Sequence, residues 1–162
     1  MVSIDLLKDF RLFEGFSDGD LEKFADVATE EFHKAGAQLC KKGDQAKSLI
    51  LLTEGKALVT LDVDAGIHAP PIRVTVDVVS KGESLGWSAV VEPYLYTRSV
   101  RCLDDLKAII FDAAKLQEIL NEDKTLGFKF MRAIARVIRK RLAHTEVILA
   151  GERGLATLAE SY

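Results

Sequence analysis

The sequence predicts an α+β fold in which an antiparallel β-barrel is flanked by N-terminal helices and one long C-terminal helix. Apolar residues recur at helical spacing as far as Glu30 and again after Asp112. Between these zones, short runs rich in Val, Ile and Leu are separated by glycine-containing turns roughly 8–12 residues apart, a pattern typical of an antiparallel sandwich or barrel. A chain of 162 residues is expected to form one domain.

The N-terminal zone, up to Glu30, is expected to hold two helices. The apolar residues with helical spacing are Ile4, Leu7 and Phe10 in the first helix and Leu21, Phe24, Ala25 and Ala28 in the second. Ser17 and Asp18 form a good N-cap for the second helix, and the negative charges of Asp18 and Asp20 suit its positive end.

Six strands are expected in the central zone, and the Gly- and Pro-containing segment 64–71 is expected to be a loop. The expected strands cover residues 38–41, 48–53, 56–63, 72–79, 97–102 and 106–111.

Two helices are expected after Asp112, over residues 113–120 and 123–149. At 100° per residue, the apolar side chains of the longer helix span an arc of roughly 160°, which is wider than the stripe of a helix packed on one neighbour. Half of this arc is expected to pack on the strands and the other half to pair with a second copy of the chain. The residues expected along the dimer helix are Phe130, Ile134, Val137, Arg141 and Ile148.

Arg141 is unusual because it falls inside this apolar arc. Its guanidinium either extends to solvent along an apolar stem or reaches an acidic group across the dimer. The opposite face, residues 129–140, is basic and is expected to be solvated; contact with nucleic acid or an acidic partner is the alternative. Residues 1–150 are expected to form the domain, and residues 151–162 a loose tail or one short turn.

Composition excludes several classes of protein. The net charge of −3 lacks the basic excess that drives non-specific nucleic-acid binding. No apolar run approaches the roughly 20 residues of a membrane span, and the N-terminus does not read as a secretory signal. Cys40 and Cys102 show no CxxC spacing, so free thiols in the cytoplasm are expected, with a single disulfide as the alternative.

No catalytic or metal-binding constellation is visible in the sequence. His33, His68 and His144 lie in three different expected elements, without HxH, HExxH or Cys/His spacing. Neither a GxSxG elbow nor a GxxxxGK[ST] phosphate loop occurs. The sequence therefore predicts a protein that is not an enzyme and that needs neither a metal nor a cofactor.

Residues 81–102 carry the candidate binding site. A strand ends at Gly86, and a short helix follows that offers backbone N–H groups and the Ser88 hydroxyl to an anion. In a regular strand, Tyr96 and Arg98 share one face, whereas a bulge would reverse this. The alternative is a plain helical connection within a sandwich. The expected ligand-binding residues are Gly86, Trp87, Ser88, Ala89, Tyr96, Thr97 and Arg98.

The order of elements and several glycine-marked motifs resemble the cyclic-nucleotide-binding domain family, the regulatory module of catabolite-activator-type transcription factors, kinase regulatory subunits and gated channels. These motifs are LFEGFS at 12–17, LCKKGD at 39–44, GKALV at 55–59 and GESLGWSAVV at 82–91, the last matching the phosphate-binding cassette. The resemblance runs from about Leu6 to Leu149. It implies a jelly-roll fold and a regulatory or sensor module that binds a nucleotide-like anion and signals through its C-terminal helix.

Two departures from the family pattern limit what the resemblance implies. Where nucleotide-binding members place a Glu for the ribose and an Arg for the cyclic phosphate, this chain has Trp87 and Tyr96. Tight binding of cAMP or cGMP is therefore not expected, and Arg98 is the nearest cationic replacement. The alternative function is a ligand-free dimeric interaction module that acts on a separate effector. Too few residues follow Leu149 for the family's helix-turn-helix module, so no DNA-binding module is expected in this chain.

Overall fold

The computed structural model describes residues 2–63 and 72–159, with side chains as far as residue 151. The loop expected over 64–71 lies outside the described residues. The N-terminal elements are α1 (Ile4–Lys8), the 3-10 turn η1 (Arg11–Phe13) and α2 (Asp18–Asp26). The central elements are β1 (Ala28–His33), β2 (Gln38–Cys40), β3 (Ser48–Glu54), β4 (Lys56–Val63), β5 (Ile72–Ser80), β6 (Ser84–Leu85), the 3-10 turn η2 (Trp87–Ala89), β7 (Ser99–Cys102) and β8 (Leu106–Asp112). The helices α3 (Ala113–Glu122) and α4 (Lys124–Ala159) follow.

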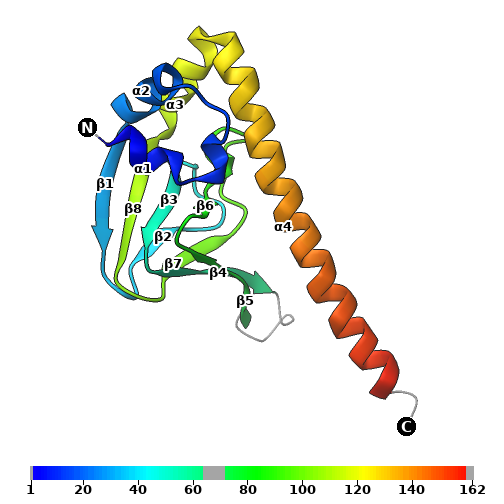
Figure 1. Cartoon of the computed structure of the whole chain (residues 1–162). Coiled ribbons are helices and arrows are strands. Elements are labelled where there is room, and N and C mark those ends of the chain that lie inside the picture. Colours follow the sequence, from blue (N-terminus) through cyan, green and yellow to red (C-terminus); the bar gives the residue numbers. More distant parts are fainter. Residues whose placement is uncertain (1, 64–71, 160–162) are drawn as a thin grey trace.

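The strands form two antiparallel sheets of four strands each. Their orders are β1-β8-β3-β6 and β2-β7-β4-β5. The N-terminal helices and α3 lie at one end of the sheets, and α4 runs along one side and projects past β5 (Figure 1). The predicted α+β, jelly-roll class is confirmed, although in the described part of the chain no ladder joins the two sheets into a closed barrel.

Strand β1 was not predicted, because helical spacing was expected to continue to Glu30. The structure places Ala28–His33 in a strand that pairs with β8 over six residues at the edge of its sheet. Only Ala28 is buried, and the next four residues are exposed. An edge strand with so little buried surface lacks the alternation of apolar and polar residues by which a strand is recognised.

Five phenylalanines form the centre of the core at the end of the sheets where the helices gather. The rings come from η1, the turn after it, α2, β8 and α4, and belong to Phe13, Phe16, Phe24, Phe111 and Phe130. Phe130 and Ile134 of α4 are 0% and 1% exposed in this core. Both were expected in a dimer interface; that assignment is wrong, because this part of the apolar arc packs against the chain's own helices and sheet.

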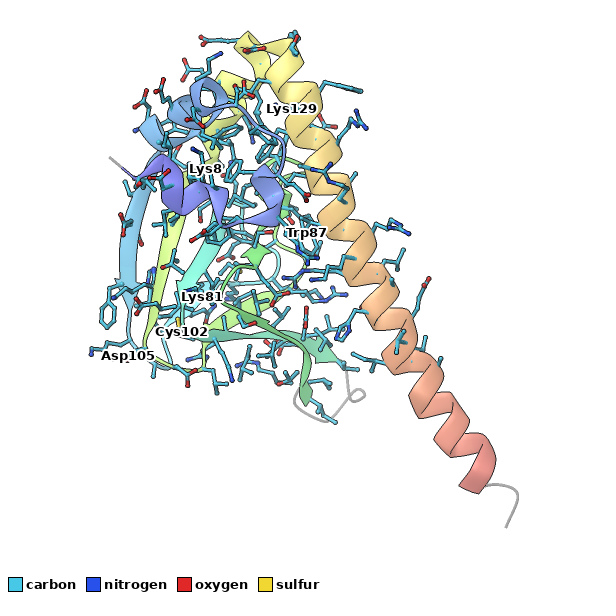
Figure 2. All side chains as sticks on the ribbon, viewed as in Figure 1. Lys8, Lys81, Trp87, Cys102, Asp105 and Lys129 are labelled. Atoms are coloured by element: carbon cyan, nitrogen blue, oxygen red, sulfur yellow. The ribbon has the colours of Figure 1, made fainter. Side chains whose placement is uncertain are left out.

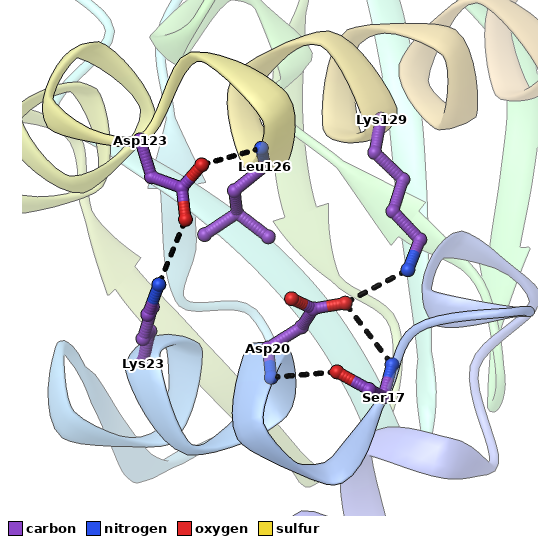
Figure 3. Close-up of polar contacts among 6 residues, drawn as sticks. All are labelled: Ser17, Asp20, Lys23, Asp123, Leu126 and Lys129. Atoms are coloured by element: carbon purple, nitrogen blue, oxygen red, sulfur yellow. Dashed lines mark hydrogen bonds and ion pairs between the residues drawn. The ribbon is translucent and has the colours of Figure 1, made fainter.

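Two ion pairs join α2 to the beginning of α4 (Figure 3). Asp20 Oδ2 lies 2.8 Å from Lys129 Nζ, and Asp123 Oδ2 lies 2.8 Å from Lys23 Nζ. The predicted N-cap of α2 is also present, since Ser17 and Asp20 exchange side-chain and backbone hydrogen bonds. The hydrogen bond from Lys129 holds the pKa of the Asp20 carboxyl below its ordinary value. Lys129 thus contacts α2 and departs from the expectation of a solvated basic face, whereas the other basic residues of that face are exposed as expected: Arg132, Arg136, Arg139 and Lys140.

Helix α4 continues to Ala159, so the expected loose tail is wrong for residues 151–159. Gly151 and Gly154 each cost a helix about 1 kcal/mol relative to Ala, but they do not end this one. The intervening and following residues are mainly Glu, Arg, Leu and Ala, which favour the helix, and extending an existing helix is far easier than starting one. None of the helices in the described residues is long and apolar enough to cross a membrane.

Candidate functional site

The candidate site begins where β6 ends at Gly86. This residue has φ +81° and caps the N-terminus of η2. A Cβ at this position would lie 2.6 Å from the carbonyl oxygen of Ser48 on β3. Glycine is therefore needed both for the left-handed backbone and for the close approach of β3.

A cavity of about 50 Å³ lies beside this turn. Its lining residues are Cys40, Val59, Leu85, Gly86, Trp87, Ser88, Tyr96, Thr97, Arg98, Val100 and Arg141. Six of the seven predicted ligand-binding residues are among them. The exception is Ala89, which is fully buried and whose carbonyl oxygen accepts a hydrogen bond from Gln117 Nε2 of α3 at 2.6 Å.

Tyr96 and Arg98 reach this cavity for a reason other than the predicted one. Strand β7 begins at Ser99, and Thr97 and Arg98 lie in a bend before it. Strand alternation therefore does not apply, and Thr97 lines the same cavity as its two neighbours. The expected strand over residues 97–102 is two residues too long, because Thr97 continues the β-favouring run without a break signal in the sequence.

The hydroxyl of Tyr96 is fully used inside the protein. It donates a hydrogen bond to the carbonyl oxygen of Ser48 at 3.1 Å and accepts one from the Ser48 amide at 3.1 Å. Tyr96 is 7% exposed. Its side chain therefore ties the segment before β7 to β3, and offers a ligand the face or edge of its ring more readily than its hydroxyl.

The cavity is positively charged. Arg98 and Arg141 line it, and among its described lining residues none is acidic. Arg98 is exposed, and its Nη1 donates to the carbonyl oxygen of Thr97 at 2.8 Å. Burial raises the pKa of the Cys40 thiol to about 12, so this residue is neutral at physiological pH and adds no negative charge to the cavity.

Arg141 brings α4 into the site. Its Nη1 lies 2.6 Å from Asp77 Oδ2 of β5, and its Nη2 donates to the carbonyl oxygen of Ser84 at 2.8 Å. The guanidinium carbon lies 5.2 Å from the centre of the Trp87 ring, which faces α4 (Figure 2). The Arg141 side chain is 18% exposed. The sequence predicted that Arg141 either extends to solvent or reaches an acidic group across a dimer. It does contact an acidic group, but that group, Asp77, belongs to the same chain.

Asp77 is the residue of this arrangement that sequence reasoning missed. Its signal is faint: a carboxylate in a strand otherwise rich in Val, just as Arg141 is a cation in an apolar arc. When two elements pack together, a carboxylate in one and a cation in the other can form an ion pair and so lower the cost of burying both. Among the residues that the structure describes, no group of three or more His, Cys, Asp or Glu side chains could hold a metal ion.

Arg141 limits the size of any ligand in this conformation. Small-molecule pockets usually measure about 300–1,000 Å³, whereas the cassette cavity measures about 50 Å³. A water molecule or a very small ion fits, but a nucleotide does not. A larger ligand can enter only if lining side chains such as Arg141 move aside.

Comparison with known proteins identifies the fold family. The family model for the cyclic nucleotide-binding domain matches residues 30–123. A cGMP-dependent protein kinase, isozyme 1, from Drosophila melanogaster is 27% identical over an alignment of 127 residues, and the match covers 72% of this chain and 16% of the kinase. The chain thus spans about one sixth of that relative.

Solved structures show the same likeness. One is a protein from Geobacter metallireducens GS-15 described as a candidate cyclic nucleotide-binding protein, with a TM-score of 0.76 and 27% identity, covering 88% of this chain and 99% of that one. Another is the N-terminal domain of a transcriptional regulator from Streptomyces coelicolor A3(2), with a TM-score of 0.68 and 25% identity, covering 84% of this chain and 94% of that one. Because the family model matches more than half of its length and these structures share its fold, the chain belongs to the cyclic nucleotide-binding domain family.

Proposed function

We propose that this chain is a non-enzymatic regulatory module that binds a small anion at its cassette and signals through α4. The observation that carries the proposal is that two arginines line the cassette cavity, of which Arg98 forms no ion pair among the described residues and Arg141 is paired with Asp77, a residue outside the lining. Arg98 lies at the exposed rim of this cavity, and Arg141 is the side chain that α4 contributes. Charge-assisted hydrogen bonds from guanidinium groups are among the strongest that proteins offer an anion.

The contacts of Arg141 suggest how binding reaches α4. In the closed arrangement, its guanidinium is bound by the Asp77 carboxylate, the Ser84 carbonyl and the Trp87 ring. An incoming anion competes with the Asp77 carboxylate for the Arg141 guanidinium. It also needs the space in the cavity that the Arg141 side chain occupies. A ligand shifts a conformational equilibrium only by its difference in affinity for the two states. Here the two states have Arg141 bound to Asp77 or displaced from it, and only the displaced state leaves room for the ligand.

Binding of cAMP is expected to be weak, with a dissociation constant no tighter than about 100 µM, because neither Trp87 nor Tyr96 supplies a charged partner. A two-dimensional NMR titration measures constants in this range, with the amides of Gly86, Ser88 and Thr97 as reporters. Arg98→Ala is expected to weaken binding at least about threefold, through loss of a partly screened charge contact.

Arg136→Ala is the matched control, because Arg136 is exposed on α4 and does not line the cavity. A submicromolar constant would overturn the expectation of weak binding. Equal affinities of wild type and Arg98→Ala would remove Arg98 from the site, and no shift at any of the three reporters would favour the second candidate function.

The second candidate is a dimeric interaction module that works without a ligand. It is favoured by the far end of α4, where large apolar side chains are exposed by 43% or more: Leu142, Val147, Ile148 and Leu149. Of the expected dimer residues, Ile148 alone is exposed, since Val137 is half-buried and Arg141 is bound to Asp77.

We expect a homodimer formed by the far ends of two α4 helices, because an apolar patch on a projecting helix is stabilised by self-association. Light scattering at tens of micromolar should give twice the mass of 17.9 kDa. Ile148→Glu should shift the protein toward monomer, whereas Arg136→Glu should not. A wild-type monomer at this concentration would contradict the dimer.

A further inference from the structure

A second and larger cavity lies on the other side of Arg141. It measures about 330 Å³ and is formed by η1 and the residue before it, the end of β5 with the turn to β6, and α4. In Figure 1, η1 lies beside α4. Its volume reaches the lower bound of small-molecule pockets, about 300 Å³, which the cassette cavity does not.

One part of its wall is apolar. Phe10 and Leu12, each 3% exposed, come from the N-terminal segment, and Val78 and Val137 come from β5 and α4. Phe10 and Leu12 are well packed, whereas Val78 is 44% exposed; together these side chains form an apolar wall against which a ring or a short alkyl group can lose its contact with water.

The polar part of the wall carries an excess of cationic side chains. The cationic residues Arg11 and Lys140 line the cavity together with His144, and no ion pair or side-chain hydrogen bond involves any of the three among the described residues. Lys140 and His144 are four residues apart, and therefore project from the same face of α4. They and Arg11 approach the cavity from two different elements.

The two carboxylates in the lining are already engaged. Asp77 is paired with Arg141 at 2.6 Å. Glu83 accepts hydrogen bonds from the backbone amide and the hydroxyl of Ser80, at 3.0 and 3.2 Å. Glu83 keeps its negative charge, so the lining holds three cationic side chains, Arg11, Lys140 and Arg141, against two carboxylates, and the excess is positive beside an apolar wall.

We propose that this cavity binds a small amphipathic anion, meaning a compact ring or alkyl body that carries one carboxylate or phosphate. The body lies against Phe10, Leu12 and Val137, and the anionic group lies between Arg11 and Lys140. The proposal does not depend on ligand binding at the cassette. Because Arg141 lines both cavities, an occupant of this one alters the environment of the side chain that closes the other, and such coupling is reciprocal.

Phenyl phosphate is a suitable probe, with inorganic phosphate and phenol as matched probes that keep only the charge or only the ring. In an NMR titration of the full chain, phenyl phosphate should shift the amides of Leu12, Gly82 and Val137, with an affinity at least about tenfold above that of either matched probe. Arg11→Gln and Lys140→Gln should each weaken binding about threefold, and together about tenfold.

Two control variants separate this site from the cassette. Arg136→Gln, on the same helix but outside the lining, should bind phenyl phosphate as wild type does, and so should Arg98→Ala. The proposal is overturned if the shifts are confined to Gly86–Ser88, if the double variant binds as tightly as wild type, or if inorganic phosphate binds as tightly as phenyl phosphate.

Discussion

Replacing Phe24 by Ala is expected to lower the free energy of unfolding by about 4 kcal/mol. Phe24 is fully buried, and its ring centre lies 4.9 to 6.3 Å from those of four other phenylalanines. Deletion of the ring leaves a cavity where α2, β8 and α4 meet, and the surrounding backbone elements cannot all move in to fill it. For a domain of this size, the midpoint of thermal unfolding should fall by roughly 10 °C.

Urea unfolding followed by circular dichroism measures this change. Phe32→Ala is the matched control, because it removes the same ring from an edge strand where Phe32 is 53% exposed. Its cost should stay below about 1 kcal/mol. Similar losses in the two variants would show that the phenylalanine cluster is not the centre of the core. Because Phe130 stacks on Phe24, Phe24→Ala should also loosen the beginning of α4.

The interior strands were predictable because their sequences carry a strong local signal. Strand β3 has four consecutive buried residues, 49–52, and pairs on both sides, so its apolar run is continuous. Strand β1 was missed for the opposite reason: it lies at an edge, and its charged residues face solvent. A strand is therefore recognised in the sequence by the apolar residues that it buries, and an exposed edge strand such as β1 gives no such signal.

The cassette was found from its motif, whereas the residues that close it were not. Gly86 is required by local backbone geometry, which leaves a trace in the sequence. The contact between Arg141 and Asp77 joins residues 64 positions apart, and no local period links them. The broad apolar arc of α4 was recognised, but nothing in its spacing shows that Phe130 packs inside the chain while Ile148 is exposed.

Replacing Arg141 by Ala is expected to lower the free energy of unfolding by about 2 kcal/mol and to loosen α4 from the cassette. The pair that it forms with Asp77 is largely buried, with side-chain exposures of 18% and 26%. Removal of one partner leaves the Asp77 carboxylate without its counter-charge in a poorly solvated position, and that cost is larger than the net value of the pair. Arg141→Ala also removes the hydrogen bond to Ser84 and the contact with Trp87.

A double-mutant cycle with Asp77→Asn isolates the pair, and its coupling energy should be about 1–2 kcal/mol.

Hydrogen exchange supplies a readout that a general loss of stability would not reproduce. The amides of α4 beyond residue 141 should exchange faster in Arg141→Ala, while the amides of β3 should lose protection only in proportion to the loss of global stability. Arg141→Lys keeps the charge but cannot contact Asp77 and Ser84 through two nitrogens, so it should restore only part of the protection. Arg136→Ala, exposed on the same helix, should exchange as wild type does. If Arg141→Ala and Arg136→Ala give the same exchange pattern, the guanidinium does not hold α4 to the cassette, and signalling through this contact is ruled out.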